Sequence, residues 1–304
     1  MQRVLFRGVY TAMVTPFTEK DNIDEDALKA MIDAQVRGGA AGLVPCGTTG
    51  ECPTLSHIEH DRVIWLTVHY AAGRLPVIAG TGSNATSEAI QLSRHAQANG
   101  ADACLLVNPY YNKPTQKGLY LHFKAVADSV DIPCILYNIK GRTGVNLETD
   151  TLIKLANDCP NIVGVKEASG NLVQMEDVVN RSQDSFSVLS GDDNMTLDLL
   201  GKGGDGVVSV ASNIVPRMMS TMVSLFQGGK VKEATALNDL LAPFFKACFI
   251  ETNPIPIKTA MARYGWCRES FRLPLCTLDG DEHRSALYQA LDALDAAGWI
   301  ERRD

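Results

Sequence analysis

Lys166 ends a short apolar run, residues 162–166, that is typical of a buried strand. An ammonium group at such a position is costly to desolvate, so burial lowers its pKa and leaves some free amine at neutral pH. A free amine fixed on a strand can attack a ketone and form a Schiff base. The alternative is a lysine that leans from the strand end into water. The position of the strand in the fold decides between the two interpretations.

Eight apolar runs predict buried strands, and a helical pattern follows each of them. The expected strands span residues 8–15, 42–46, 76–80, 103–108, 134–138, 162–166, 187–191 and 206–210. The expected helices span residues 24–38, 56–72, 87–99, 118–129, 149–157, 172–181, 195–201 and 216–228. Continuous apolar strands indicate a parallel sheet covered by helices, which is an α/β fold. Eight repeats favour a closed (β/α)8 TIM barrel over an open doubly wound sheet.

Three more helical stretches follow the eighth repeat, at residues 230–248, 256–264 and 282–297. We therefore assign residues 1–228 to the barrel and residues 229–304 to a C-terminal helical appendage. Because no linker, charge run or low-complexity tract separates them, we expect one structural unit that includes a helical subdomain.

Composition narrows the class of protein. The 304 residues carry a formal net charge of -7, which argues against a nucleic-acid or anionic-membrane surface. The eight cysteines contain no Cys-x-x-Cys pair, and several fall in strand-like runs, so we interpret them as small buried hydrophobes in a reducing compartment. The N-terminal residues do not resemble a signal peptide, and no run approaches the ~20 apolar residues of a membrane span. The expected location is the cytoplasm.

Reactive groups of a (β/α)8 barrel lie at the C-terminal ends of the strands. Here those ends supply a lysine, tyrosines, threonine hydroxyls and an arginine, namely Thr48, Thr49, Tyr110, Tyr111, Tyr137, Arg142 and Lys166. Such a set suits imine chemistry, in which the amine is the nucleophile and the phenols and hydroxyls carry protons. The arginine can bind a carboxylate in bidentate fashion. This chemistry requires neither a metal nor a cofactor.

Other chemistries fit less well. The histidines fall in helical stretches, so a histidine metal site or a Ser-His-Asp triad lacks its base. Asp192 and Asp193 share a loop, but no partner acid for a glycosidase ends a facing strand. The segment Gly80-x-Gly82-x-x-Ala85 fits a dinucleotide-binding pattern. That pattern expects an acidic residue at the end of the next strand, and this chain has none there.

Several motifs, in their order and spacing, resemble the dihydrodipicolinate synthase/N-acetylneuraminate lyase family of class I aldolases. They are GVYTA (8–12), GTTGE (47–51), PYYNKP (109–114), VKEASGN (165–171), SGDD (190–193), NPIPIK (253–258) and LP (273–274). Together they span nearly the whole chain. The resemblance implies a (β/α)8 enzyme that condenses pyruvate with L-aspartate 4-semialdehyde in lysine and diaminopimelate biosynthesis. It also implies a homotetramer made of two tight dimers.

The resemblance also implies roles for particular residues. Lys166 would form the Schiff base with pyruvate, and Tyr137 would be the acid and base beside it. Thr49 would link Tyr137 to Tyr111, which the neighbouring subunit contributes in this family. Residues for substrate binding would be Thr48 on the pyruvate carboxylate, Arg142 on the carboxylate of the second substrate, and Gly191 and Val208 through their backbone.

Two features bear on specificity and regulation. The family pattern before Arg142 has a proline where this chain has Lys140. One interpretation is that the lysine loosens the turn that carries the arginine. The favoured alternative is a surface lysine in a tolerant loop. Lysine-inhibited members of the family bind L-lysine at the tight-dimer interface. The positions that match this effector site are Pro53, His57, His60, Gly82, Asn84, Glu88 and Tyr110.

Two further functions stay open at the level of the sequence. One is a pyruvate-dependent aldolase or dehydratase that acts on a sugar acid or another 2-oxo acid. The other is a barrel without catalysis that binds lysine or serves as a scaffold. The second is weakened because Lys166, Tyr137, Thr49, Tyr111 and Arg142 are all present.

Overall fold

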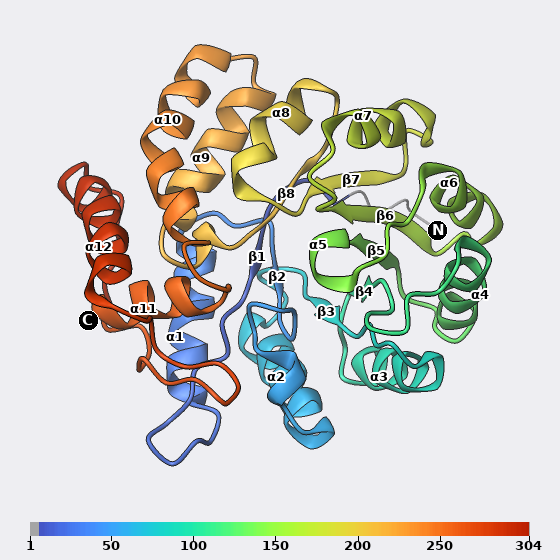
Figure 1. The fold of residues 1–304 in the computed structure, drawn as a ribbon, viewed down its shortest axis with the longest axis horizontal. Coiled ribbons are helices and arrows are strands. Elements are labelled where there is room, and N and C mark those ends of the chain that lie inside the picture. The colour runs from blue at the N-terminus through green and yellow to red at the C-terminus, as the bar shows by residue number, and fades with distance from the viewer. Residues whose placement is uncertain (1–5, 304) are drawn as a thin grey trace.

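The computed structural model describes residues 6–303, in which eight parallel strands form one sheet (Figure 1). Their order is β2-β1-β8-β7-β6-β5-β4-β3. The strands are β1 (Gly8–Ala12), β2 (Gly42–Val44), β3 (Ile78–Gly80), β4 (Ala103–Val107), β5 (Cys134–Asn138), β6 (Ile162–Glu167), β7 (Ser187–Ser190) and β8 (Gly206–Ser209). The sheet closes because β2 also meets β3. Leu43 N donates to Pro76 O over 2.9 Å, and Gly80 N donates to Pro45 O over 3.0 Å. The expected (β/α)8 barrel is confirmed.

A helix follows each strand and covers the outside of the barrel (Figure 1). The helices are α1 (Glu25–Arg37), α2 (His57–Ala71), α3 (Thr86–Ala98), α4 (Gln116–Ala127), α5 (Lys140–Thr143), α6 (Thr149–Asp158), α7 (Leu172–Arg181), α8 (Thr196–Gly201) and α9 (Pro216–Gln227). The short α5 was not expected. The start predicted near Ser56 is correct, because Ser56 and Glu59 form a reciprocal capping box at the beginning of α2.

The strand limits differ from the expected ones for local reasons. β2 ends at Val44, since Pro45 has no N–H and Cys46 has a φ of 56°. β3 begins at Ile78, two residues after Pro76. β6 continues to Glu167 rather than ending at Lys166, because Glu167 still pairs with Asn138 of β5.

The C-terminal segment forms α10 (Val231–Ala247), α11 (Ile255–Arg263) and α12 (Asp281–Ala296). In Figure 1 these helices lie along one side of the barrel, beside α9 and α1. A single apolar cluster contains barrel residues such as Val9 and Met218 together with Phe244, Ile257 and Leu291 of the appendage. The appendage therefore shares a core with the barrel. Within residues 6–303, no helix is long and apolar enough to cross a membrane.

The interior of the barrel has its own apolar cluster, which includes Tyr10, Leu105, Ile135, Leu189 and Val208.

The eight cysteines are free thiols, and five of them are buried. The sequence prediction that several would pack as buried hydrophobes is correct.

Candidate active site

Lys166 lies on β6 in the interior of the barrel. In the register of the sheet it is level with Tyr137 of β5 and Leu189 of β7, whose side chains belong to the interior cluster. Only 6% of Lys166 is exposed. The interpretation of Lys166 as a lysine that leans into solvent is therefore wrong. Its amine occupies the inside of the barrel near the C-terminal ends of the strands.

The surroundings of Lys166 increase the fraction of its amine that is neutral. Burial lowers the pKa of Lys166 to about 8, although the negative charges of Asp192 and Asp193 partly oppose the shift. Its Nζ lies 4.2 Å from the centre of the Tyr137 ring. Within residues 6–303, no carboxylate comes close enough to Lys166 to form an ion pair. The amine is therefore buried beside the Tyr137 ring and has no bonded carboxylate.

Gly191 leaves room for the lysine side chain. A Cβ atom at this position would lie 3.1 Å from Lys166 Cε and 2.5 Å from the Cβ of Ala168. Val208 lies on β8 in the same interior cluster and is 1% exposed. Both predicted positions thus line the barrel interior.

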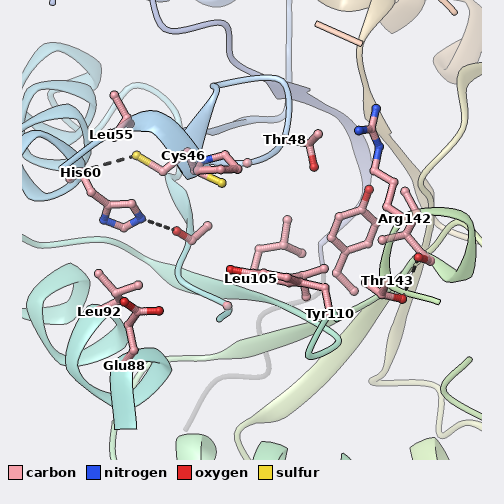
Figure 2. Close-up of a pocket in the computed structure, with 18 of the residues that line it drawn as sticks. Cys46, Thr48, Leu55, His60, Glu88, Leu92, Leu105, Tyr110, Arg142 and Thr143 are labelled. Atoms are coloured by element: carbon pink, nitrogen blue, oxygen red, sulfur yellow. Dashed lines mark hydrogen bonds between the residues drawn. The ribbon is translucent and has the colours of Figure 1, made fainter. Parts of the chain in front are cut away.

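Tyr137 lies beside Lys166, and the two threonines belong to the loop that follows β2. Burial, reinforced by the charge of Asp192, raises the pKa of Tyr137, so its phenol is protonated at neutral pH. Thr49 is buried and Thr48 is half-buried. Tyr137, Thr48 and Arg142 line a cavity of about 360 Å³. Figure 2 shows Thr48 and Arg142 at one end of this cavity.

Asn253 is a site residue that was missed as a candidate. Its Nδ2 donates to Thr49 Oγ1 over 3.0 Å, and its backbone oxygen accepts a hydrogen bond of 3.1 Å from Arg142 Nη2. The side chain is buried, and its Oδ1 has no hydrogen-bond partner within the described chain. Asn253 precedes α11, far from Thr49 in sequence. Only the motif NPIPIK marked it, and a motif does not show which side chain it contacts.

The turn that carries Arg142 is formed without the family's proline. Lys140 is the first residue of α5, and its oxygen accepts a hydrogen bond of 2.9 Å from Gly144 N. Thr143 N also donates to Ile139 O over 3.0 Å. The N–H of a residue in the first turn of a helix has no partner within the helix. Proline lacks this N–H, so replacing proline by lysine here neither adds nor removes a helical hydrogen bond. The effect of Lys140 on the mobility of this turn stays a prediction.

Tyr111 does not join the site of its own chain. It has a φ of 74°, and its side chain is 91% exposed. The neighbouring Tyr110 is 40% exposed and lines the cavity. Within one chain, therefore, Tyr137 lies beside Lys166, and Asn253 connects Arg142 to Thr49, whereas Tyr111 contacts none of them.

Most positions that match the effector site line the same cavity. These are Pro53, His57, His60, Gly82, Glu88 and Tyr110, whereas Asn84 does not line it. Figure 2 shows His60 and Glu88 at the end of the cavity away from Arg142, and Tyr110 closer to Arg142. His57 Nε2 lies 2.9 Å from Glu88 Oε1, and hydrogen bonds from Ser83 and His57 lower the pKa of Glu88.

His60 of α2 is buried against the end of β3. It is 5% exposed, its Nε2 lies 2.9 Å from Gly80 O, and burial lowers its pKa. Its neutral ring thus bridges α2 to the end of β3.

The features behind the competing chemistries have structural explanations. A Cβ atom at Gly80 would lie 2.4 Å from Cys46 O, and one at Gly82 would lie 2.3 Å from Val107 N. These glycines permit close backbone packing, which accounts for them without a bound phosphate. Asp193 accepts hydrogen bonds of 2.9 Å from Val210 N and Ala211 N, so its carboxylate holds the loop after β8.

Several known proteins are similar to this chain in sequence and in fold over nearly their whole length. The 4-hydroxy-tetrahydrodipicolinate synthase of Syntrophus aciditrophicus (strain SB) is 55% identical over 271 residues, which is 89% of this chain and 92% of that protein. The crystal structure of a chloride-inhibited dihydrodipicolinate synthase from Acinetobacter baumannii complexed with pyruvate superposes with a TM-score of 0.92 at 41% identity, covering 97% of this chain and 100% of that one.

A third relative was solved with a different small molecule. The crystal structure of the dihydrodipicolinate synthase from Cyanidioschyzon merolae with lysine bound superposes with a TM-score of 0.93 at 40% identity, covering 97% of this chain and 99% of that one. The sequence pattern of the dihydrodipicolinate synthetase family matches residues 5–294. The chain belongs to the dihydrodipicolinate synthetase family.

Proposed function

We propose that this chain condenses pyruvate with L-aspartate 4-semialdehyde to give 4-hydroxy-tetrahydrodipicolinate. The observation that carries the proposal is the buried amine of Lys166, which has a lowered pKa, no bonded carboxylate and a protonated phenol beside it. The activity of relatives about half identical to this chain agrees with it. The thiols of eight free cysteines agree with a reducing compartment, and we place the reaction in the cytoplasm.

The first half of the reaction uses the amine. Lys166 Nζ attacks the ketone carbon of pyruvate, and loss of water gives an imine. The protonated imine draws electrons from the neighbouring methyl group, which loses a proton and becomes an enamine. Tyr137 and Thr49 carry these protons between the substrate and solvent. The hydroxyl of Thr48 helps to hold the pyruvate carboxylate, and Gly191 and Val208 contribute backbone contacts.

The second half makes the new bond. The enamine carbon attacks the aldehyde carbon of the semialdehyde and forms a C–C bond. The amino group of the semialdehyde then displaces Lys166 Nζ from the imine carbon, which closes the ring and frees the enzyme. Arg142 binds the carboxylate of the semialdehyde, and its hydrogen bond to Asn253 O orients the guanidinium.

A pyruvate-dependent enzyme that acts on a sugar acid is the second candidate, because Lys140 departs from the pattern before Arg142. Steady-state turnover with pyruvate and L-aspartate 4-semialdehyde, measured beside a panel of sugar acids, separates the two. We expect efficient turnover of the semialdehyde alone. Efficient turnover of a sugar acid with none of the semialdehyde would overturn the proposed reaction. The barrel without catalysis would be supported if borohydride with pyruvate added no mass to Lys166.

We also propose that Tyr111 acts in the site of a neighbouring subunit, within a tetramer made of two tight dimers. Its exposure of 91% leaves the ring available for such a contact. Sedimentation velocity should show a tetramer. A Tyr111→Phe variant should remain tetrameric but turn over more slowly, because the relay would lose its last hydroxyl.

L-lysine is the proposed effector at the His60 and Glu88 end of the cavity. The carboxylate of Glu88 can pair with the effector's ammonium group, and Asn84 and Tyr110 can hold its carboxylate. Titration calorimetry should give heat with L-lysine for the unmodified chain and less for a His57→Gln variant. His69→Gln, at an exposed position of the same helix, is the matched control. No heat at millimolar L-lysine would exclude the effector site.

A further inference from the structure

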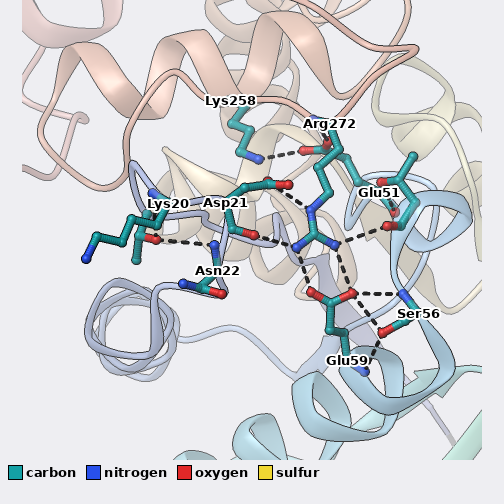
Figure 3. Close-up of polar contacts among 10 residues, drawn as sticks. Lys20, Asp21, Asn22, Glu51, Ser56, Glu59, Lys258 and Arg272 are labelled. Carbon is teal, nitrogen blue, oxygen red and sulfur yellow. Dashed lines mark hydrogen bonds and ion pairs between the residues drawn. The ribbon is translucent and has the colours of Figure 1, made fainter.

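Glu51 and Lys258 form an ion pair that is completely buried between the barrel and the appendage. Lys258 Nζ lies 2.5 Å from Glu51 Oε1, and both side chains are 0% exposed (Figure 3). The second carboxylate oxygen accepts a hydrogen bond of 3.2 Å from Arg272 N. Lys258 Nζ also lies 4.2 Å from the centre of the Phe17 ring. The proposed mechanism makes no use of either charge.

The pair lies next to the proton relay. Glu51 ends the loop 47–51 that follows β2, two residues after Thr49. This loop is tightly turned, because Gly50 N donates to Gly47 O over 3.0 Å and Glu51 N donates to Thr48 O over 3.1 Å. Glu51 has a φ of 54°, which an L-residue adopts only when its surroundings hold it there. A shift of the Glu51 carboxylate would therefore be transmitted to Thr48 and Thr49.

The helix α11 holds this loop at two points. Lys258 lies within α11 and binds Glu51, and Asn253, just before the helix, donates to Thr49 Oγ1 over 3.0 Å. Because Asn253 supplies the proton of that bond, the hydroxyl hydrogen of Thr49 stays available for another acceptor. The two contacts set both the position of Thr49 and the direction in which its hydroxyl donates.

Anchoring of the appendage does not by itself explain the pair. Arg272 already ties the appendage to the barrel, with Nη2 2.6 Å from Glu59 Oε1 and Nε 2.9 Å from Asp21 Oδ1 (Figure 3). A buried ion pair is also poor evidence for stability, because well-packed apolar residues of similar volume often stabilise a protein as much or more. The remaining explanation is that the two buried charges orient the loop to which Glu51 belongs.

We propose that Glu51 and Lys258 are positioning residues of the active site, through which α11 holds the Thr48–Thr49 loop and aims the Thr49 hydroxyl. The inference rests on the proposed Schiff-base function. It assigns a catalytic contribution to the C-terminal appendage, whose residues do not contribute the nucleophile. The side chain of Glu51 is the tether between the loop and α11. A change in its length should therefore impair proton transfer more than it impairs folding.

Glu51→Asp tests the proposal because it keeps both charges but shortens the tether by one methylene. The readout is the exchange of the pyruvate methyl protons for deuterium, followed by NMR with the tetrameric protein. This exchange reports the step from imine to enamine and needs no second substrate. We expect exchange at least tenfold slower than in the unmodified chain, while borohydride still traps pyruvate on Lys166. The exposed pair Arg263 and Asp292 gives the control variant Asp292→Asn, which should exchange at the unmodified rate.

The outcomes distinguish the two proposals. A folded Glu51→Asp variant with unchanged exchange overturns the positioning role and leaves the Schiff-base function intact. If Glu51→Asp does not fold, the double variant Glu51→Gln with Lys258→Met removes both charges, and the same slow exchange is expected from it. Unchanged exchange in a folded double variant overturns the positioning role in the same way. An unmodified chain that neither traps pyruvate nor exchanges its methyl protons overturns the proposed function itself.

Discussion

Two buried lysines divide this molecule into a reactive region and a structural one. Lys166 lies in the barrel interior and Lys258 lies in the contact between the barrel and α11, and burial lowers the pKa of both. They differ in the group that lies next to the amine. Lys258 Nζ is 2.5 Å from the carboxylate of Glu51, whereas Lys166 Nζ faces the Tyr137 ring at 4.2 Å from its centre.

The comparison shows that burial alone does not make a lysine a nucleophile. The carboxylate of Glu51, at hydrogen-bonding distance, stabilises the protonated form of Lys258. The ammonium group of Lys258 therefore serves as a structural partner of Glu51. At Lys166 the nearby aspartates act only through space, so they moderate the fall in pKa without binding the amine. The absence of a bonded carboxylate distinguishes the reactive site from the structural one.

The largest expected difference is in adduct formation. Replacing Lys166 by methionine should abolish the pyruvate adduct completely, because Lys258 is the only other buried lysine among residues 6–303 and it lies outside the barrel interior. Mass spectrometry after borohydride reduction measures the adduct. Lys258→Met, assayed at a temperature where it is folded, should still trap pyruvate. An adduct that survives in Lys166→Met, or that maps to Lys258, would reverse the assignment of the two lysines.

In stability, the order of the two variants should be reversed, because Lys258→Met should lose more than Lys166→Met. Lys258→Met leaves the Glu51 carboxylate buried without a countercharge, with only the hydrogen bond from Arg272 N, which should lower the free energy of unfolding by about 3–5 kcal/mol. Lys166→Met removes an amine that burial disfavours, so the free energy of unfolding should be unchanged or higher. Urea unfolding at one fixed protein concentration measures both. Equal losses for the two variants would show that Lys166 has a stabilising partner after all.

Crowding around Lys166 offers a finer test. Gly191→Ala would place a Cβ atom 3.1 Å from Lys166 Cε, so we expect a displaced lysine and a loss of about 1–3 kcal/mol in stability. The rate of borohydride trapping should fall with it. Gly201→Ala is the control, because its Cβ atom would lie 3.8 Å from its nearest neighbour, Phe226. Unchanged trapping in Gly191→Ala would mean that the lysine stem is free to move aside.

The smallest expected effect is on pH dependence. With a pKa of about 8, Lys166 is mostly protonated at pH 7 and mostly neutral at pH 9. The rate of pyruvate trapping should therefore rise about tenfold between these two pH values, since only the neutral amine attacks the ketone. Trapping measured at fixed pyruvate across pH 6 to 10 gives the midpoint. A midpoint near the ordinary value of an exposed lysine would indicate that the amine is solvated.

Much of the fold could be predicted from the sequence. The eight strands were placed within a few residues because their apolar runs are short, continuous and separated by helical patterns. The ends were less predictable. Pro45 and the positive φ of Cys46 stop β2 early, and the register with Asn138 extends β6 to Glu167. Such limits depend on the partner strand as well as on local propensity.

The candidate site was predictable where a residue follows directly from a strand. Tyr137 and Lys166 are level in the register of β5 and β6, as their strand-end positions indicated. Asn253 was missed as a site residue because it reaches Thr49 from a segment 204 positions away in the chain. The roles of all the candidate site residues stay predictions. Asn84 lies outside the cavity lining and Tyr111 is exposed, so one chain does not bring these two to the others.

The sequence by itself determined the barrel, the strand that carries Lys166 and the polar residues at the neighbouring strand ends, because hydrophobic periodicity and strand order are local properties. Only the tertiary structure decided which buried lysine is paired and which is not, since desolvation acts on both and a carboxylate from a distant segment reaches only one. It also decided that α11 meets the Thr48–Thr49 loop. A contact between residues some two hundred positions apart depends on the packing of the closed barrel against its appendage.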